Sequence, residues 1–282
     1  MVGLKAGGKG IQLEMHDASR TIGFGALILA LVAAGIALIL SRGSEPAPTA
    51  TAVRDSTPAA ASRGEPAALS QQQAGRDEVL DLPARGTPLA WVRFGERVEI
   101  RSAPGGPVTE TVGPETQYGS RSVFSVAKTD GEWAGVPNPF TGNGVLGWIK
   151  LDPDQLKAGY TTHAIVVDLS EHRAQLIRAG EVLRTFTVSV GAPGAETPTG
   201  SFAVTDTFRG GLNPVYGCCA VALTAVQPKL PSGWIGGDRI AIHGTTGPLG
   251  VNVSHGCVRA ADRDVSALVD DVPPGAPVTI RQ

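Results

Sequence analysis

One cysteine and two histidines lie close together near the end of this 282-residue chain. His243 and Cys257 are separated by 13 residues, and His255 stands two positions before the cysteine. A thiol is a useful nucleophile only as its thiolate, and a nearby imidazole can take its proton. The glycines and the proline between His243 and Cys257 allow the chain to turn back. Gly256 would let a substrate carbonyl approach and would leave amides free for an oxyanion hole. The spacing predicts nucleophilic chemistry.

Two other interpretations of these residues remain open. Cys257 can be a small buried hydrophobic residue between loop histidines. A zinc site of His243, His255 and Cys257 is conceivable, because residues two apart on an extended segment share a face. No fourth ligand follows at a metal-like spacing, so the sequence predicts no metal. His255 is poorly placed as the base, because residues two apart on a loop rarely bring their side chains together.

The neighbouring segments extend the pattern. Residues 243–245 read His-Gly-Thr, and residues 254–259 read Ser-His-Gly-Cys-Val-Arg. Upstream, residues 196–202 read Glu-Thr-Pro-Thr-Gly-Ser-Phe, and residues 236–243 read Gly-Gly-Asp-Arg-Ile-Ala-Ile-His, a segment expected to be the strand that ends in the histidine. Together these motifs resemble the active-site signature of the L,D-transpeptidase (YkuD-like) catalytic domain family. The resemblance covers roughly residues 161–282.

This resemblance implies a role for each motif residue. Cys257 would be the nucleophile and His243 the general acid and base. His255 and Gly256 would shape the oxyanion loop. Gly244 would orient the catalytic histidine through its backbone.

Three further residues are predicted to contact substrate. Arg259 is placed to bind a carboxylate or to support the loop, and a structural salt bridge is an equal alternative. Ser254 belongs to the same motif. Tyr216 precedes a glycine in a segment that resembles the border of the family's substrate groove.

The reaction implied by the resemblance is acyl transfer on peptidoglycan stem peptides. The thiolate would attack the carbonyl of the third residue of a tetrapeptide, expel D-alanine and form 3→3 crosslinks through a thioester. No cofactor is needed, and carbapenem-type inhibitors are expected to bind. An L,D-carboxypeptidase would use the same residues with water as the acceptor. A non-catalytic cell-wall-binding protein is the alternative of a different class, against which the intact Cys257 and His243 argue.

The N-terminal part of the chain predicts a membrane anchor. Residues 22–40 contain no charge, and as a helix they would span about 28 Å, close to the hydrocarbon thickness of a bilayer. A cleaved signal peptide is the alternative, but no small-x-small site follows at once. Residues 1–21 are expected to be cytoplasmic and residues 41–87, rich in Ala, Pro and Ser, to be a disordered linker. The prediction is a single-pass protein of the bacterial cell membrane whose catalytic domain faces the cell wall or periplasm.

The rest of the chain predicts a mostly β fold. Short apolar runs and turn residues at 88–153 resemble a bacterial SH3-like β-barrel. The Ser125-x-x-Lys128 pattern of penicillin-binding enzymes lies in this strand pattern and is not expected to act. Alternating residues in 161–282 predict a β-sandwich-type catalytic domain with few helices, and one helix is expected from an Asp262 cap to Pro273.

Charge and cysteine content bound the remaining possibilities. The formal net charge is −2 and charged residues make up 18% of the chain, so no polybasic surface predicts binding to nucleic acid. Cys218 and Cys219 are adjacent, and a disulfide between neighbours would be strained. In a strand they would point to opposite faces. The sequence therefore favours two inert, buried thiols.

Overall fold

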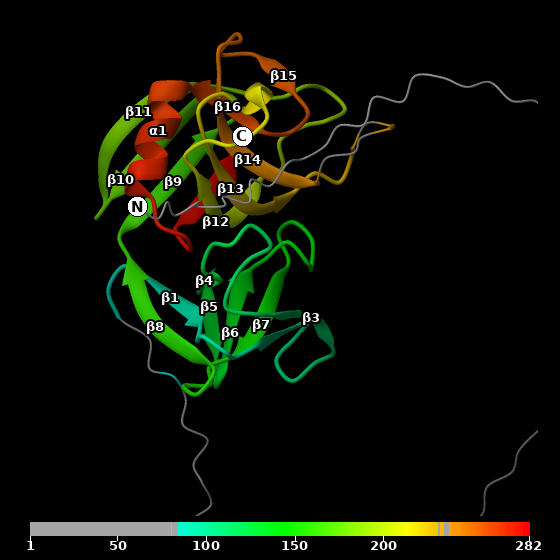
Figure 1. Ribbon diagram of the computed structural model, residues 1–282, viewed down its shortest axis with the longest axis vertical. Helices are drawn as coiled ribbons and strands as arrows, with labels where there is room; N and C mark the ends of the chain where they lie inside the picture. The colour runs from blue at the N-terminus through cyan, green and yellow to red at the C-terminus, as the bar shows by residue number, and fades with distance from the viewer. Residues whose placement is uncertain (1–79, 81–83, 231, 234–236) are drawn as a thin grey trace, which may run out of the picture. The chain divides into compact units, whose positions relative to one another are not determined.

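The computed structural model describes residues 80, 84–230, 232–233 and 237–282. The predicted cytoplasmic segment, the anchor at 22–40 and nearly all of the linker lie outside these residues. Within the described ranges, no helix is long and apolar enough to cross a bilayer. The described part is mostly β and contains one α-helix, α1, as the sequence predicted (Figure 1).

The first β region runs from residue 87 to residue 161 and contains two small sheets. One has the order β4-β1-β8 and the other the order β3-β2-β7-β6-β5. The strands are β1 (Thr87–Val92), β2 (Val98–Arg101), β3 (Val108–Val112), β4 (Val123–Ser125), β5 (Lys128–Asp130), β6 (Trp133–Pro137), β7 (Leu146–Lys150) and β8 (Leu156–Thr161).

Alternation of side chains explains this region. Val98 and Ile100 on β2 point into a core that also contains Val136 and Ile149, whereas Glu99 is exposed. Strand β8 follows the predicted boundary at residue 153 and pairs antiparallel with β1. Ser125 and Lys128 fall on β4 and β5 and not on a helix. The likeness to SH3-like barrels stays a prediction.

The second β region contains one nine-stranded sheet with the order β10-β9-β17-β12-β13-β14-β16-β11-β15. Strand β10 also pairs with β11, so the sheet wraps round and closes on itself. Its elements are β9 (His163–Asp168), β10 (Arg173–Arg178), β11 (Glu181–Gly191), β12 (Gly200–Phe208), the 3₁₀-helix η1 (Pro214–Tyr216), β13 (Ala220–Val226), β14 (Arg239–Thr245), β15 (Asn252–Ser254), β16 (Val258–Ala261), α1 (Asp262–Asp271) and β17 (Pro277–Arg281).

The wrapped sheet encloses a single apolar core. Central strand β13 is buried along nearly its whole length, since neighbouring strands and α1 cover it. Helix α1 presents Val265, Leu268 and Val269 to this core, the stripe that the sequence predicted. The helix ends before Pro273 because that residue cannot continue it.

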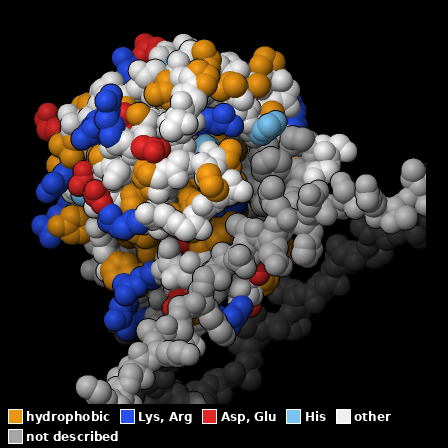
Figure 2. Space-filling model, turned by 45° about the horizontal axis from the view of Figure 1, so that its top comes forward, with side chains coloured by type: hydrophobic (Ala, Val, Ile, Leu, Met, Phe, Trp, Pro, Cys, Tyr) orange, Lys and Arg blue, Asp and Glu red, His pale blue; other side chains and the backbone are white. Residues whose placement is uncertain are grey.

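Side chains link the two β regions. Asn143, in the loop between β6 and β7, donates to the Val226 carbonyl at 2.7 Å and accepts from the Val226 amide at 2.9 Å. The hydroxyl of Thr116 donates to the carboxylate of Asp206 on β12. Figure 2 shows basic, acidic and hydrophobic side chains interspersed over the face in view.

Candidate active site

Two parallel neighbouring strands position the predicted catalytic pair. In the register of β14 and β16, His243 lies opposite Arg259, and Ile242 lies opposite Val258. Ile242 and Val258 point into the core, so His243 and Arg259 share the other face of the sheet. Cys257 stands directly before β16, and its thiol forms a hydrogen bond with the backbone of Ala241, two residues before His243. The pairing of these strands brings together residues that the sequence separates.

The His243 ring is buried and fixed in one orientation. Its side chain is 2% exposed, and Nδ1 lies 2.8 Å from the Gly244 carbonyl oxygen. An Nδ1–H donor to that carbonyl orients the ring, and the Tyr216 backbone forms a second hydrogen bond with it. The Tyr216 ring meets the imidazole edge to face, with centroids 5.0 Å apart. Burial, the largest cause, lowers the pKa of His243 below 6.5, so the ring is neutral at neutral pH.

The position of Gly244, whose carbonyl holds the ring, has no room for a side chain. A Cβ there would lie 2.2 Å from Oδ1 of Asp262 and 3.0 Å from the amide nitrogen of Cys218. The Asp262 carboxylate in turn accepts a hydrogen bond from that Cys218 amide at 3.2 Å. Helix α1 and the segment after η1 therefore pack directly behind the histidine.

Cys257 rests as a neutral thiol. Burial is the largest cause and raises its pKa above 9.0, while a hydrogen bond with the Ala241 backbone and the charge of Arg259 act in the opposite direction. The neighbouring histidine is also neutral. Both groups are thus neutral and do not form a preformed ion pair.

Ser254 stabilises the loop that carries the Cys257 thiol through two hydrogen bonds. The buried Ser254 hydroxyl donates to the Cys257 carbonyl at 2.6 Å and accepts from the Gly256 amide at 3.1 Å. The expectation that the Gly256 amide is free for an oxyanion was therefore wrong, because Ser254 already uses it. The predicted contact of Ser254 with substrate stays a prediction. Gly256 itself adopts a φ of 111°, and a Cβ would lie 2.2 Å from Nε2 of Gln227.

Two residues that sequence reasoning did not assign to the site support this loop. The hydroxyl of Thr197 donates to the Gly256 carbonyl at 2.8 Å and accepts from the Gly191 amide at 2.9 Å. The Gln227 amide group lies at hydrogen-bond distance from three carbonyl oxygens: Ala195 at 3.3 Å, Glu196 at 3.2 Å and His255 at 3.0 Å. Thr197 belongs to the motif at residues 196–202, which indicated a functional segment, whereas no local sequence pattern pointed to Gln227.

Two local predictions were wrong next to the histidine. Cys218 and Cys219 form a disulfide, because Cys218 lies in the turn after η1 and not in a strand, where the side chains would diverge. Asp262 does not cap α1. The cap position is Ala261, without a side-chain hydrogen bond, because the Asp262 carboxylate bonds to the Cys218 amide instead.

The remaining predicted residues border the same face. Tyr216 is half-buried, and burial together with the nearby Cys257 raises its pKa above 10.0. The Nε atom of Arg259 is buried and has no hydrogen-bond partner among the described residues. His255 lies exposed in the loop before Cys257. Within the described residues, no cluster of three or more His, Cys, Asp or Glu side chains is arranged to hold a metal ion.

The second β region is similar to known catalytic domains. Residues 162–280 match the family model described as YkuD, L,D-transpeptidase catalytic domain. The Putative L,D-transpeptidase YkuD of Bacillus subtilis (strain 168) is 30% identical over 120 residues, which cover 42% of this chain and 65% of that protein. The Probable L,D-transpeptidase YbiS of Escherichia coli (strain K12) is 29% identical over 144 residues, 45% of this chain and 47% of that protein. The chain thus spans less than two thirds of these relatives, and the resemblance is confirmed for the catalytic domain.

Solved structures give further similarities. The L,D-transpeptidase from Mycobacterium smegmatis is 21% identical, with a TM-score of 0.37, over 73% of this chain and 99% of that chain. The L,D-transpeptidase 3 from Mycobacterium tuberculosis in complex with a faropenem-derived adduct is 18% identical, with a TM-score of 0.38, over 49% of this chain and 73% of that chain.

Proposed function

We propose that this protein is a cysteine-dependent L,D-transpeptidase that forms 3→3 crosslinks between peptidoglycan stem peptides. The observation that carries the proposal is the buried His243 ring, held by the Gly244 carbonyl on β14, the strand whose Ala241 backbone bonds to the Cys257 thiol. The family match of residues 162–280 supports the reaction class. A wall-binding scaffold would not need an imidazole with one fixed tautomer beside a thiol.

In the first half-reaction, Nε2 of His243 accepts the thiol proton as the sulfur of Cys257 attacks the carbonyl of the third stem residue. A C–S bond forms, and the carbonyl oxygen becomes an oxyanion. Because Ser254 uses the Gly256 amide, we assign the oxyanion to the amide of Cys257. The C–N bond to D-alanine then breaks, and the imidazolium gives its proton to the leaving amine.

In the second half-reaction, an amine of another stem attacks the thioester. His243 takes a proton from this amine, and the C–S bond breaks to restore the thiol after the proton returns to sulfur. Water in place of the amine would give the carboxypeptidase reaction. The choice between them depends on which acceptor occupies the groove when the thioester is present.

Arg259 is suited to bind the substrate. Its Nε is buried without a partner among the described residues, and its guanidinium shares the face of His243. A buried donor that lacks a partner is costly. We therefore assign it to a carboxylate or carbonyl oxygen of the stem peptide, which would supply the missing acceptor.

The test is a product analysis with a purified disaccharide-tetrapeptide. The wild-type protein should release D-alanine and form a dimer with a 3→3 link, detected by mass spectrometry. Cys257→Ala should form none, and His243→Ala should react about 10²–10⁴-fold more slowly. His163→Ala, a change at a histidine outside the site, is the matched control. Crosslinking by Cys257→Ala would refute the cysteine mechanism, and tripeptide as the only product would replace transpeptidase by carboxypeptidase.

A carbapenem provides a second readout of the same site. The β-lactam carbonyl should acylate Cys257 and leave one stable adduct, seen by intact mass and assigned by peptide mapping. Cys218 and Cys219 should carry none, since their sulfurs are bonded to each other.

The proposal places the catalytic domain outside a bacterial membrane, anchored by residues 22–40. The full-length chain should sediment with membranes, and a chain without residues 1–42 should be soluble and active. A native mature protein that begins near Val53 would show instead that the apolar stretch is a cleaved signal.

A further inference from the structure

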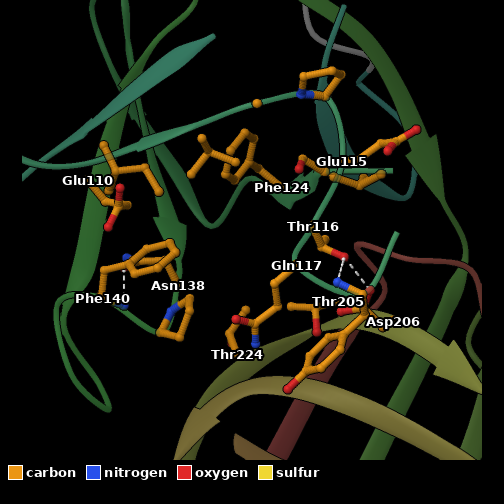
Figure 3. Close-up of a pocket in the computed structure, with 18 of the residues that line it drawn as sticks. Glu110, Glu115, Thr116, Gln117, Phe124, Asn138, Phe140, Thr205, Asp206 and Thr224 are labelled. Atoms are coloured by element: carbon orange, nitrogen blue, oxygen red, sulfur yellow. Dashed lines mark hydrogen bonds between the residues drawn. The ribbon is translucent and has the colours of Figure 1, made fainter. Parts of the chain in front are cut away.

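A cavity lies in a part of the structure whose lining includes neither His243 nor Cys257. It has a volume of about 530 Å³ and is lined by the 110–118 segment and the β6–β7 loop on one side and by β12 and β13 on the other. Figure 3 shows Thr116, Asn138 and Phe140 of the first β region around the same space as Asp206 and Thr224 of the second. The volume falls within the range of about 300–1,000 Å³ that is typical of small-molecule sites.

Two polar atoms in this cavity wall lack partners. Oγ of Ser122 and Oδ2 of Asp206 are buried and make no hydrogen bond, in residues that are 3% and 1% exposed. Among the described residues only one other side-chain atom is buried in this way, Nε of Arg259 at the catalytic site. Buried polar groups are normally paired, so exceptions that line a cavity point to a ligand.

The Asp206 carboxylate already interacts with neighbouring side chains of the cavity wall. Its Oδ1 accepts a hydrogen bond from Thr116, and its charge acts on the buried guanidinium of Arg239. Arg239 itself is held by the Leu223 carbonyl at 2.9 Å and by the Thr205 hydroxyl at 3.1 Å. The ligand therefore needs to supply a neutral hydrogen-bond donor to Oδ2 and not a positive charge.

The rest of the wall is apolar and aromatic. Phe124 and Phe140 line the cavity, and Tyr118 and three prolines add further apolar surface. Aromatic rings favour flat apolar faces, and hydroxyl edges suit a carboxylate and a serine. A pyranose ring combines an apolar C–H face with a rim of hydroxyl groups.

We propose that this cavity binds a saccharide. A sugar hydroxyl donates to Oδ2 of Asp206, a second polar group of the sugar pairs with the Ser122 hydroxyl, and the ring packs against Phe140. The site is separate from Cys257, and the assignment does not depend on the reaction proposed above.

The test is calorimetric titration of the full-length chain in detergent with two β-1,4 tetramers, chitotetraose and cellotetraose. At least one should bind, and the comparison tells whether an acetamido group or hydroxyls alone are recognised. Asp206→Asn keeps an acceptor for Thr116 but turns Oδ2 into a donor, and it should weaken binding at least tenfold. Ser122→Ala should also weaken it. Asp130→Asn, on exposed strand β5, is the matched control and should bind like wild type.

Acylation of Cys257 by a carbapenem checks that each variant is folded, and it should be unchanged in all of them. If Asp206→Asn lost acylation as well, the smaller change Ser122→Ala would decide. No binding of either tetramer at millimolar concentration, or equal binding by wild type and Ser122→Ala, would overturn the saccharide site. Stronger binding of an alkylammonium ion than of either tetramer would overturn it too, because the cavity would then select a cation. Loss of acylation with intact sugar binding would count against the proposed function alone.

Discussion

Replacing Gln227 by glutamate should destabilise the loop that carries the Cys257 thiol, because the Gln227 side chain holds that loop. In the wild-type protein one NH₂ group faces the carbonyl oxygens of Ala195, Glu196 and His255 at 3.0–3.3 Å. Glutamate keeps the shape but presents an acceptor to three acceptors. A hydrogen bond contributes about 0.5–1.5 kcal/mol, and a buried group left unpaired costs about 1–3 kcal/mol. The variant should therefore lose about 2–4 kcal/mol of unfolding free energy at pH 8.

The loss should depend on pH with a known sign. Burial and the three carbonyls raise the pKa of the new carboxyl group in the folded state above the ordinary value of about 4.3. Ionisation of the glutamate then adds a further penalty to the folded state. The penalty is absent below about pH 4.3, grows as pH rises towards the folded-state pKa, and is complete above it, at about 1.4 kcal/mol per unit of pKa shift.

Urea unfolding at pH 5 and pH 8 measures this difference, and the rate of carbapenem acylation reports on the loop. Gln155→Glu is the matched control, because its side chain is partly exposed in the first β region. At pH 8, Gln227→Glu should acylate more slowly than wild type, and the ratio of the two rates should recover as pH falls. Equal destabilisation of the two variants, or a loss that does not change with pH, would refute the role assigned to this amide.

Two further predictions concern the histidine and its support. The acylation rate of wild type should be flat near neutral pH and fall only below about pH 6.5, since burial lowers the pKa of His243 and a protonated ring cannot accept the thiol proton. His243→Ala should instead gain rate towards the raised pKa of Cys257, and a wild-type fall that begins above pH 7 would contradict the assignment. Asp262→Ala removes the acceptor of the Cys218 amide and should slow acylation by about 2–10-fold, the equivalent of one hydrogen bond. Asp262→Asn keeps an acceptor and should react nearly like wild type, so equal damage by both changes would count against a positioning role.

Local patterns in the sequence were sufficient to predict the main elements, and they indicated His243 and Cys257 as candidates for the reacting pair. Alternating residues predicted the strands, because one face of each strand must be buried. A 3.6-residue stripe predicted the helix that the structure places at Asp262–Asp271. The residues around His243 and Cys257 predicted a thiol nucleophile with an imidazole base, since they and the upstream motif resemble the family's active-site signature.

Short-range reasoning failed where a side chain has two possible partners. Asp262 stands at a helix start and was predicted to cap it, yet its carboxylate bonds to Cys218, 44 residues earlier. The Gly256 amide was predicted to be free, yet Ser254 binds it. In each case the position in the sequence identified a group able to form a hydrogen bond, and only the packed structure decided which partner it found.

Sequence by itself thus determined which residues are candidates for chemistry and which segments form strands, because both depend on residue type and spacing over a few positions. Tertiary structure alone decided that Gln227 supports the loop of Cys257, that Cys218 and Cys219 meet in a turn, and that Ser122 and Asp206 line one cavity. The physical reason is that burial and hydrogen-bond pairing between distant segments depend on where the chain places them. The spacing of residues over a few positions of the sequence does not determine that placement.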